Sequence, residues 1–172
     1  MRAVFLDKDG TLVENVPYNV DPGRVRLAPG ALQAVWALHR TGYLIIVVSN
    51  QPGIALGLFE EKDLRQVERH LRALLPIAAM YFCPHPPDGG CACRKPASGM
   101  LVEAAQAHGI DLAESWMVGD ILDDVEAGRR AGCRTVLVDN GNETEWLMSE
   151  ERRPHARVGG LPEAAEIICG AA

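Results

Sequence analysis

The amino-acid sequence predicts an α/β fold in which a Rossmann-like, doubly wound parallel sheet is covered by helices on both faces. Short apolar runs with the length of buried strands alternate along the chain with longer segments that have helical apolar spacing. The apolar runs are continuous, which is typical of strands buried on both faces of a parallel sheet. We find no repeat, low-complexity tract or linker, so we expect residues 1–172 to form one domain.

The expected strands begin with the run AVFL and continue with runs such as YLIIVVS; the last run, ARV, predicts a weak edge strand. In chain order they span residues 3–6, 43–49, 78–83, 116–120, 135–139 and 156–158. The first expected helix has a proline near its start and a terminating glycine. In chain order the helices span residues 29–42, 60–75, 99–109, 124–132 and 161–168. We expect Trp36 and Trp116 to lie in the core.

The composition excludes several classes of protein. The formal net charge is -6, so nothing indicates a general attraction to nucleic acid or to an anionic membrane. The chain start lacks the pattern of a signal peptide, because its apolar stretch is short and two acids follow at once. The run YLIIVVS is far too short to span a membrane. We therefore expect a cytoplasmic monomer whose cysteines stay reduced.

Polar segments follow the first four expected strands. They are DKDGT, SNQPG, the stretch from CPH to CACRKP, and GDILDD. Because ligands bind beyond the carboxyl ends of parallel strands, we expect these segments to form one site.

The pair Asp7 and Asp9 predicts the chemistry of that site. Side chains two apart on an extended backbone project to the same side, and two close carboxylates repel unless a cation lies nearby. Asp120, after the fourth strand, brings a third carboxylate, and three oxygen donors suit Mg²⁺. A carboxylate held there can attack phosphorus and form an aspartyl-phosphate. The alternative, a simple DKDG turn, is weakened by the acid after the other strand.

Four segments of the sequence resemble the motifs of a known family. The segments FLDKDGTL, VVSNQPGIALG, CRKP and MVGDILDDVEAG, within about the first 140 residues, resemble the four motifs of the haloacid dehalogenase superfamily of phosphohydrolases. The resemblance implies that Asp7 is the nucleophile and that Asp9 is the general acid and then the general base. It also implies that Asp7, the main-chain carbonyl of Asp9, and Asp120 bind Mg²⁺, with Asp124 supporting the metal site.

The same resemblance assigns the groups around the phosphate. Ser49 and Asn50 would hold the transferring phosphoryl oxygens, and Lys95 would neutralise the developing charge. We expect Gln51, in the same motif, to contact the substrate. Arg94 is our candidate for contacting the substrate beyond the reacting phosphate, because a guanidinium group suits phosphate and hydroxyl oxygens.

A cluster of cysteines predicts a second metal. Three thiols and one imidazole within eleven residues form a complete tetrahedral set for structural Zn²⁺: Cys83, His85, Cys91 and Cys93. Four ordinary loop residues or a disulfide are weaker alternatives in a cytosolic protein. Because four protein ligands leave no open position, the zinc would order the loop, about residues 83–95, and hold Arg94 and Lys95 near the phosphate. We expect Cys133 and Cys169 to serve packing.

The zinc loop followed by CRKP is similar to that of the D-glycero-D-manno-heptose 1,7-bisphosphate 7-phosphatases, and the histidinol-phosphate phosphatases share it. Both groups lack a large cap domain, and residues 10–31 and 53–81 leave no room for one. The resemblance thus implies a capless fold and a small phosphorylated substrate. The substrate we expect is the heptose bisphosphate, and the alternative is histidinol phosphate or another small phosphometabolite. The chain departs from the family pattern at Leu56, Ser98 and Ile121.

Two other classes of function remain open. A receiver-like signalling domain also carries an aspartyl-phosphate on a parallel sheet, but its phosphoryl group persists, whereas Asp9 is placed to activate water. The other class is a zinc-stabilised nucleic-acid-binding module or a phosphatase acting on polynucleotide ends. The acidic balance and the few aromatic residues disfavour it.

Overall fold

A six-stranded parallel sheet runs through the computed structural model, which describes residues 1–171. The strand order is β3-β2-β1-β4-β5-β6, and each neighbouring pair is parallel. The strands are β1 (Ala3–Leu6), β2 (Leu44–Asn50), β3 (Ile77–Cys83), β4 (Trp116–Gly119), β5 (Arg134–Val138) and β6 (Ala156–Val158). The order reverses between β1 and β4, as in doubly wound folds, so the predicted fold class is confirmed.

The helices follow the pattern expected from the sequence, and their ends differ from the predicted ones by at most two residues. They are α1 (Ala31–Arg40), α2 (Glu61–Leu74), α3 (Gly99–His108), α4 (Leu122–Ala131) and α5 (Leu161–Gly170), with 3-10 turns at Pro22–Arg24 and Leu112–Glu114. Local chemistry sets several ends. The Glu60 backbone N–H donates to the Asp63 carboxylate (2.9 Å) at the start of α2. Gly109 and Gly132 end α3 and α4 at positive φ.

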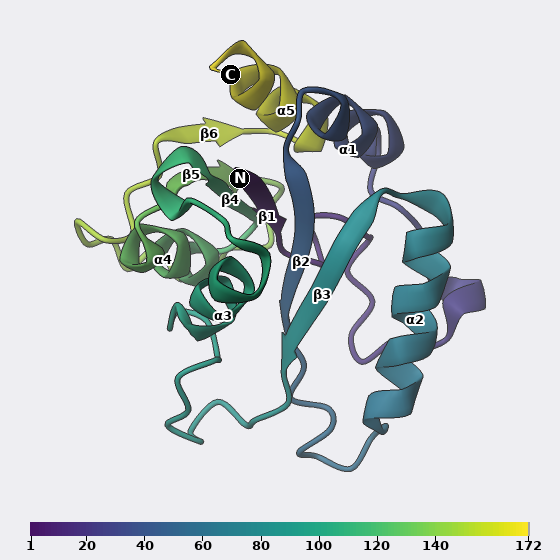
Figure 1. The fold of residues 1–172 in the computed structure, drawn as a ribbon. Coiled ribbons are helices and arrows are strands. Elements are labelled where there is room, and N and C mark those ends of the chain that lie inside the picture. The colour runs from purple at the N-terminus through teal and green to yellow at the C-terminus, as the bar shows by residue number, and fades with distance from the viewer. Residues whose placement is uncertain (172) are drawn as a thin grey trace.

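Helices cover both faces of the sheet (Figure 1), and the sheet separates two hydrophobic cores. Val4 and Leu6 of β1 pack with residues of α1, α2 and α5, whereas Ala3 and Phe5 pack with residues of α3 and α4. Successive strand residues thus supply opposite faces, and both faces of β1 are fully buried. This burial on both faces holds the carboxyl ends of β1 and β4 in fixed positions beside each other.

The two expected core tryptophans have different environments. Trp116 of β4 is 4% exposed, as predicted, but the prediction for Trp36 was wrong because this side chain is 39% exposed. The buried residues of α1 are Ala31, Ala34, Val35 and Leu38, which form one helical stripe. Trp36 lies beside that stripe, and its indole N–H donates to the Leu74 carbonyl (3.3 Å) at the end of α2. The ring therefore joins the middle of α1 to the end of α2 at the surface.

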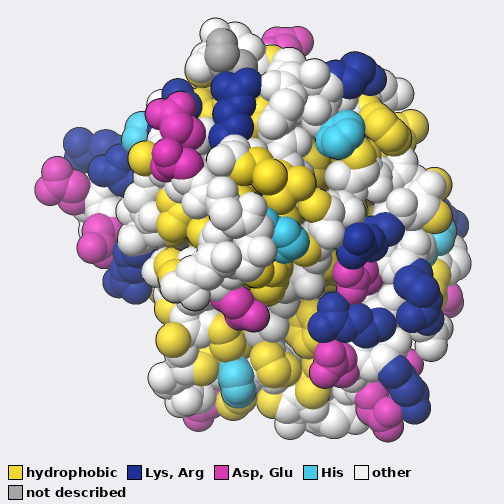
Figure 2. Space-filling model, in the orientation of Figure 1, with side chains coloured by type: hydrophobic (Ala, Val, Ile, Leu, Met, Phe, Trp, Pro, Cys, Tyr) yellow, Lys and Arg dark blue, Asp and Glu magenta, His cyan; other side chains and the backbone are white. Residues whose placement is uncertain are grey.

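Paired charges cover the outer side of α2. Arg65 forms ion pairs with Glu61 and Glu68, and Arg72 pairs with Glu68. Figure 2 shows basic side chains next to acidic ones on this side of the molecule. Such exposed pairs contribute little stability, so the apolar face of α2 does most to hold the helix in place. Among residues 1–171, every helix is too short or too polar to cross a bilayer.

Candidate active site and metal centres

Three buried carboxylates meet where the strand order reverses. Asp7 follows β1, Asp120 follows β4, and Asp124 lies in the first turn of α4. One oxygen of each lies within 4.8 Å of the others. The Asp7 backbone N–H donates to the Val118 carbonyl of β4 (2.9 Å), which ties the two strand ends together. The sequence-predicted acids thus come together at the crevice where ligands bind in doubly wound folds.

Lys95 lies within this group of acids. Its Nζ donates to Asp7 Oδ1 (2.6 Å), to Asp124 Oδ1 (2.6 Å) and to the Val48 carbonyl (3.0 Å). Burial acts to lower the pKa of Lys95, but the two carboxylates outweigh burial and hold this pKa above its usual value. Burial raises the pKa of Asp7 well above its usual range; Lys95 opposes this rise, and the nearby acids add to it. The lysine alone therefore does not compensate these charges.

The site fits a divalent cation. Three ionised carboxylates against one lysine leave two negative charges, which one Mg²⁺ ion would balance. Carboxylate oxygens are the protein ligands that Mg²⁺ prefers. Asp124 Oδ1 accepts from Lys95, and its Oδ2 accepts from the backbone N–H groups of Asp120 (3.1 Å) and Ile121 (3.2 Å). Because three donors hold its two oxygens, Asp124 is suited to support a cation held by Asp7 and Asp120.

The side chain of Asp9 lies apart from the three buried acids. Its Oδ1 accepts from Lys8 Nζ (2.6 Å) and its Oδ2 accepts from Gln51 Nε2 (2.9 Å), and the side chain is 30% exposed. Gln51 Nε2 also donates to Ser49 Oγ (2.9 Å). Gln51, which we expected to contact the substrate, thus joins Asp9 to Ser49. The arrangement leaves Asp9 at the rim of the site, where solvent reaches it.

Asn50 fastens the third motif to the second. Its side-chain amide donates to the Lys95 carbonyl (3.0 Å), and its Oδ1 accepts from the Lys95 backbone N–H (3.0 Å). The side chain is thereby committed to placing Lys95. A cavity of about 200 Å³ opens onto these groups. Its lining residues are Asp7, Asp9, Asn15, Ser49, Asn50, Lys95, Asp120, Ile121 and Asn142.

Arg94 lies beside this cavity. It lines an adjoining hollow of about 380 Å³, whose other lining residues include Lys95, Asp123 and Arg130. Its Nη1 is buried and has no hydrogen-bond partner within residues 1–171. An unpaired buried donor is costly, so this atom is suited to receive an acceptor from a ligand.

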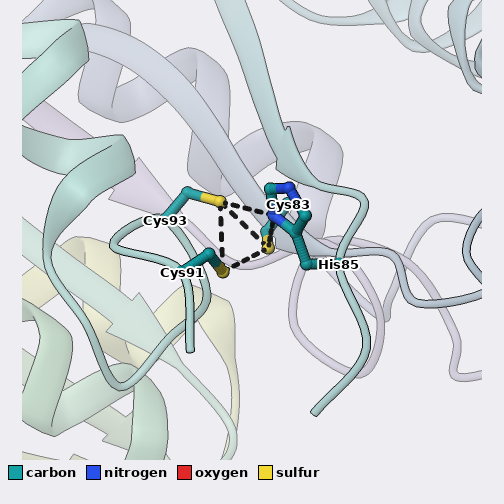
Figure 3. Close-up of side chains that lie close together, drawn as sticks. All are labelled: Cys83, His85, Cys91 and Cys93. Atoms are coloured by element: carbon teal, nitrogen blue, oxygen red, sulfur yellow. Dashed lines mark hydrogen bonds between the residues drawn. The ribbon is translucent and has the colours of Figure 1, made fainter. Parts of the chain in front are cut away.

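The predicted zinc ligands converge at the end of β3 (Figure 3). The three sulfur atoms lie 3.1–3.5 Å apart, and His85 Nδ1 lies 3.4 Å from Cys83 Sγ and 3.2 Å from Cys93 Sγ. Tetrahedral Zn²⁺ with sulfur ligands at about 2.3 Å requires sulfur atoms roughly 3.7 Å apart. The donor set and its compactness therefore fit structural zinc.

The thiols in this cluster differ in acidity. Burial acts to raise the pKa of Cys91, but the Arg94 backbone N–H and the neighbouring thiols lower it to about 6. Burial, together with the Cys83 and Cys91 side chains, raises the pKa of Cys93 to about 12. Because zinc binds thiolates, zinc binding would release protons from these thiols. The raised pKa of Cys93 makes its thiol hard to deprotonate.

Comparisons with known proteins agree with this geometry. The HAD-hydrolase-like family model matches residues 92–164. The D-glycero-β-D-manno-heptose-1,7-bisphosphate 7-phosphatase of Bordetella bronchiseptica is 35% identical, with 97% of this chain and 92% of the relative aligned. The enzyme of the same name from Haemophilus ducreyi is 39% identical over 81% of this chain and 84% of the relative. The chain belongs to the heptose bisphosphate phosphatases of the haloacid-dehalogenase-like hydrolases.

A solved structure of this family has the same fold. The D,D-heptose 1,7-bisphosphate phosphatase of Bordetella bronchiseptica, complexed with magnesium and phosphate, matches with a TM-score of 0.84 and 33% identity, covering 100% of both chains. That complex supports Mg²⁺ as the cofactor of this family member, and the Cys/His cluster fits the structural zinc. Both metals had been expected from the sequence.

Several contacts of this phosphatase-family site were missed by sequence reasoning. Two asparagines after β5 reach across to the other motifs. Asn140 Nδ2 donates to the Gly10 carbonyl (2.7 Å), and Asn142 Nδ2 donates to Asp120 Oδ2 (2.8 Å). The signal was present, because the fifth expected strand also ends in a polar segment, VDNGNE. We expected functional segments at the strand ends only after the first four strands.

Proposed function

We propose that this chain is a Mg²⁺-dependent phosphomonoester hydrolase that removes the 7-phosphate of D-glycero-D-manno-heptose 1,7-bisphosphate through an aspartyl-phosphate on Asp7. The observation that carries the proposal is the position of Asp7, buried at the reversal point of the sheet between Lys95 and the metal-binding carboxylates. The names of the relatives support the substrate.

The first half of the reaction transfers the phosphoryl group to the protein. A carboxylate oxygen of Asp7 forms a bond to phosphorus while the bond from phosphorus to the sugar oxygen breaks. Asp9, as a carboxylic acid at the rim, gives its proton to the departing sugar oxygen. Ser49 and nearby backbone N–H groups hold the phosphoryl oxygens, and Lys95 balances charge as Asp7 changes from carboxylate to acyl phosphate.

The second half restores Asp7. Asp9, now a carboxylate, accepts a proton from a water molecule, whose oxygen bonds to phosphorus while the bond from phosphorus to Asp7 breaks. The products are inorganic phosphate, Asp7 as a carboxylate, and Asp9 again carrying a proton. When bound, Mg²⁺ would draw charge from the phosphoryl oxygens and offset the repulsion among the carboxylates. The contacts of Asp9 with Lys8 and Gln51 keep its carboxyl group at the cavity.

The hollow beside Arg94 supports a substrate with a second phosphate. The Arg94 guanidinium has an unpaired buried N–H, and Arg130 lines the same hollow. Leu56 is 58% exposed and Ile121 lines the reaction cavity, so neither adds a positive charge there. Recognition of the second anion would thus depend mainly on Arg94. Histidinol phosphate, which carries an ammonium group, suits this basic hollow less well.

A phosphate-release assay with a substrate panel tests the proposal. The panel contains both anomers of the heptose bisphosphate, histidinol phosphate and simple sugar phosphates, each with Mg²⁺ and with a chelator. We expect Mg²⁺-dependent turnover with preference for the heptose bisphosphate. Preference for histidinol phosphate would overturn the substrate, and failure to release phosphate from any compound would overturn the reaction.

The variant Asp7→Asn separates chemistry from folding. It removes the attacking charge while keeping the side-chain shape, so activity should fall by at least about a thousandfold. The exposed Asp88→Asn is the matched control and should keep wild-type activity. Circular dichroism checks that both variants fold. Substantial turnover by folded Asp7→Asn would show that Asp7 is not the nucleophile, and a phospho-intermediate that persists for minutes in the wild type would favour a signalling role.

We also infer that the enzyme acts as a cytoplasmic, single-domain monomer on a small phosphorylated sugar. The relatives' names support the sugar, and the formal net charge of -6 gives no general attraction to nucleic acid or anionic membranes. Size-exclusion chromatography with light scattering tests the monomer.

A further inference from the structure

The four-residue turn Asn140–Glu143 is attached to three parts of the proposed active site. Asn140 Nδ2 donates to the Gly10 carbonyl (2.7 Å), just after the first motif. Asn142 Nδ2 donates to Asp120 Oδ2 (2.8 Å), and Glu143 Oε2 accepts from the Leu122 backbone N–H (2.6 Å) at the start of α4. The turn therefore joins the carboxyl ends of β1, β4 and β5.

The conformation of the turn is built from its own residues. Gly141 has φ of +89°, and the Asn142 backbone N–H donates to Asn140 Oδ1 (3.2 Å). The Asn140 side chain thus holds Asn142 at one of its ends and the Gly10 loop at the other. This double attachment limits where the Asn142 amide can point.

Asp120 needs such a holder. The residue is 3% exposed, and its carboxylate lies in one group with those of Asp7 and Asp124, so like charges push it away from the metal position. Thr11 Oγ1 donates to its Oδ1 (3.0 Å) and Asn142 to its Oδ2. Each oxygen therefore has one donor that sets its direction and a further lone pair free for a cation.

We propose that Asn142 is a positioning residue that orients the Asp120 carboxylate for Mg²⁺ binding. This inference rests on the proposed function, since it assigns Asp120 as a metal ligand. Asn142 acts through Asp120, so its loss should weaken Mg²⁺ binding far more than it alters substrate binding. Mutation of a residue that orients a metal ligand commonly lowers the affinity for the metal about 10- to 100-fold.

The test compares Asn142→Leu with Thr144→Leu. Leucine has the same branching at Cγ as asparagine but no donor, and the exposed Thr144 lies two residues further along the same loop. We expect Asn142→Leu to raise the Mg²⁺ dissociation constant at least about tenfold by isothermal titration calorimetry. At saturating Mg²⁺ its KM should stay within about twofold of the wild type. Its melting temperature in chelator should be unchanged, and Thr144→Leu should match the wild type throughout.

Three outcomes would overturn the inference. Wild-type Mg²⁺ affinity in Asn142→Leu would show that Asp120 needs no such holder. A lower melting temperature in chelator together with a raised KM would show that Asn142 merely supports the loop; Asn142→Ala repeats the test if leucine disturbs the turn. Failure of the wild type itself to bind Mg²⁺ would remove the proposed function and this inference with it, whereas failure confined to the variant removes the inference alone.

Discussion

Gly10 shows how closely the first and fourth motifs approach each other. A Cβ at this position would lie 2.3 Å from Asp120 Oδ2 and 2.5 Å from Asn142 Nδ2, and the backbone has φ of +91°. Two separate requirements, a left-handed backbone and an absent side chain, therefore coincide at one residue. Gly42 has only the first requirement, because its φ is +89° but a Cβ added there would meet nothing within 4 Å.

The matched pair Gly10→Ala and Gly42→Ala distinguishes backbone strain from displacement of the Asp120 side chain. Both should lose stability, because left-handed backbone costs a residue with a side chain about 1–2 kcal/mol. We expect Gly10→Ala also to displace Asp120, lowering phosphatase activity at least about tenfold, while Gly42→Ala keeps wild-type activity. Urea unfolding and phosphate release measure the two effects. Equal activity in both variants would show that the close approach at Gly10 does not matter.

Residue-level predictions from the sequence succeeded where chemistry repeats at fixed spacing. Asp7, Asp120, Asp124 and Lys95 were expected at one site, and the structure brings them together. Their individual roles stay predictions. Gln51 was expected to contact the substrate, which stays a prediction; its amide nitrogen donates to Asp9 and to Ser49. A side-chain amide can bind any of several neighbours, so its sequence position alone does not identify its partner.

At the scale of elements, the loop from Cys83 to Lys95 connects the zinc cluster to the reaction site. The cluster includes Cys93, and Arg94 and Lys95 follow at once. The loop has few buried apolar residues, so a metal would supply much of its order. The hydrogen bonds between Asn50 and the Lys95 backbone fasten its far end to β2.

Replacement of Cys91 by serine tests this connection. We expect Cys91→Ser to lose most of the zinc, about one ion per chain in the wild type, because one of four ligands is removed. Activity should fall as the loop loosens around Lys95. Metal analysis by mass spectrometry gives the zinc content, and Cys169→Ser, outside the loop, is the control. A wild type without zinc, or a variant that retains it, would contradict the assignment.

His155 couples the loop before β6 to β5. Its Nδ1 accepts from the Thr135 backbone N–H (3.0 Å), and Arg129 Nη1 lies 3.0 Å from its Nε2. Burial, and then the positive charges of Arg129 and Arg134, lower the pKa of His155. The neutral ring is therefore the form that the folded state favours. An added proton would occupy Nδ1 and break the bond to Thr135.

This lowered pKa predicts how stability depends on pH. Below about 6.5, the ordinary value, the unfolded chain takes up a proton that folded His155 resists, so the free energy of unfolding should fall as pH decreases. The fall should end once the pH passes below the lowered pKa. We expect His155→Gln to flatten this part of the profile measured by urea unfolding between pH 7.5 and pH 5 (roughly the titration range of histidine). His70→Gln on α2 should keep the wild-type slope; an unchanged slope in His155→Gln would refute the explanation.

At the scale of the whole molecule, the strand order decides where the chemistry takes place. The reversal between β1 and β4 leaves a crevice beyond their carboxyl ends, and helices cover the sheet on both faces (Figure 1). The first motif and the acids of the fourth are more than a hundred residues apart, yet the parallel pairing of β1 with β4 makes them neighbours. The site therefore depends on the complete sheet.

The sequence by itself determined the fold class, the elements and the four donors that fit a zinc site. Continuous apolar runs, helical spacing and four donors within eleven residues are local patterns, and local patterns report local structure. It did not determine that Trp36 lies at the surface bridging two helices, although the buried stripe of α1 excludes that residue. A lone large apolar residue predicts burial, and tertiary packing can override that preference.

Only the tertiary structure decided which groups hold the active-site acids in place. Lys95 reaches Asp7 across 88 residues, Asn142 reaches Asp120 from the loop after β5, and Asp9 faces Lys8 and Gln51 rather than the buried acids. These partners come from loops whose paths are set by the packing of the whole sheet. A short hydrogen bond needs side chains placed to within a few tenths of an ångström, and no spacing along a chain specifies that placement between distant segments.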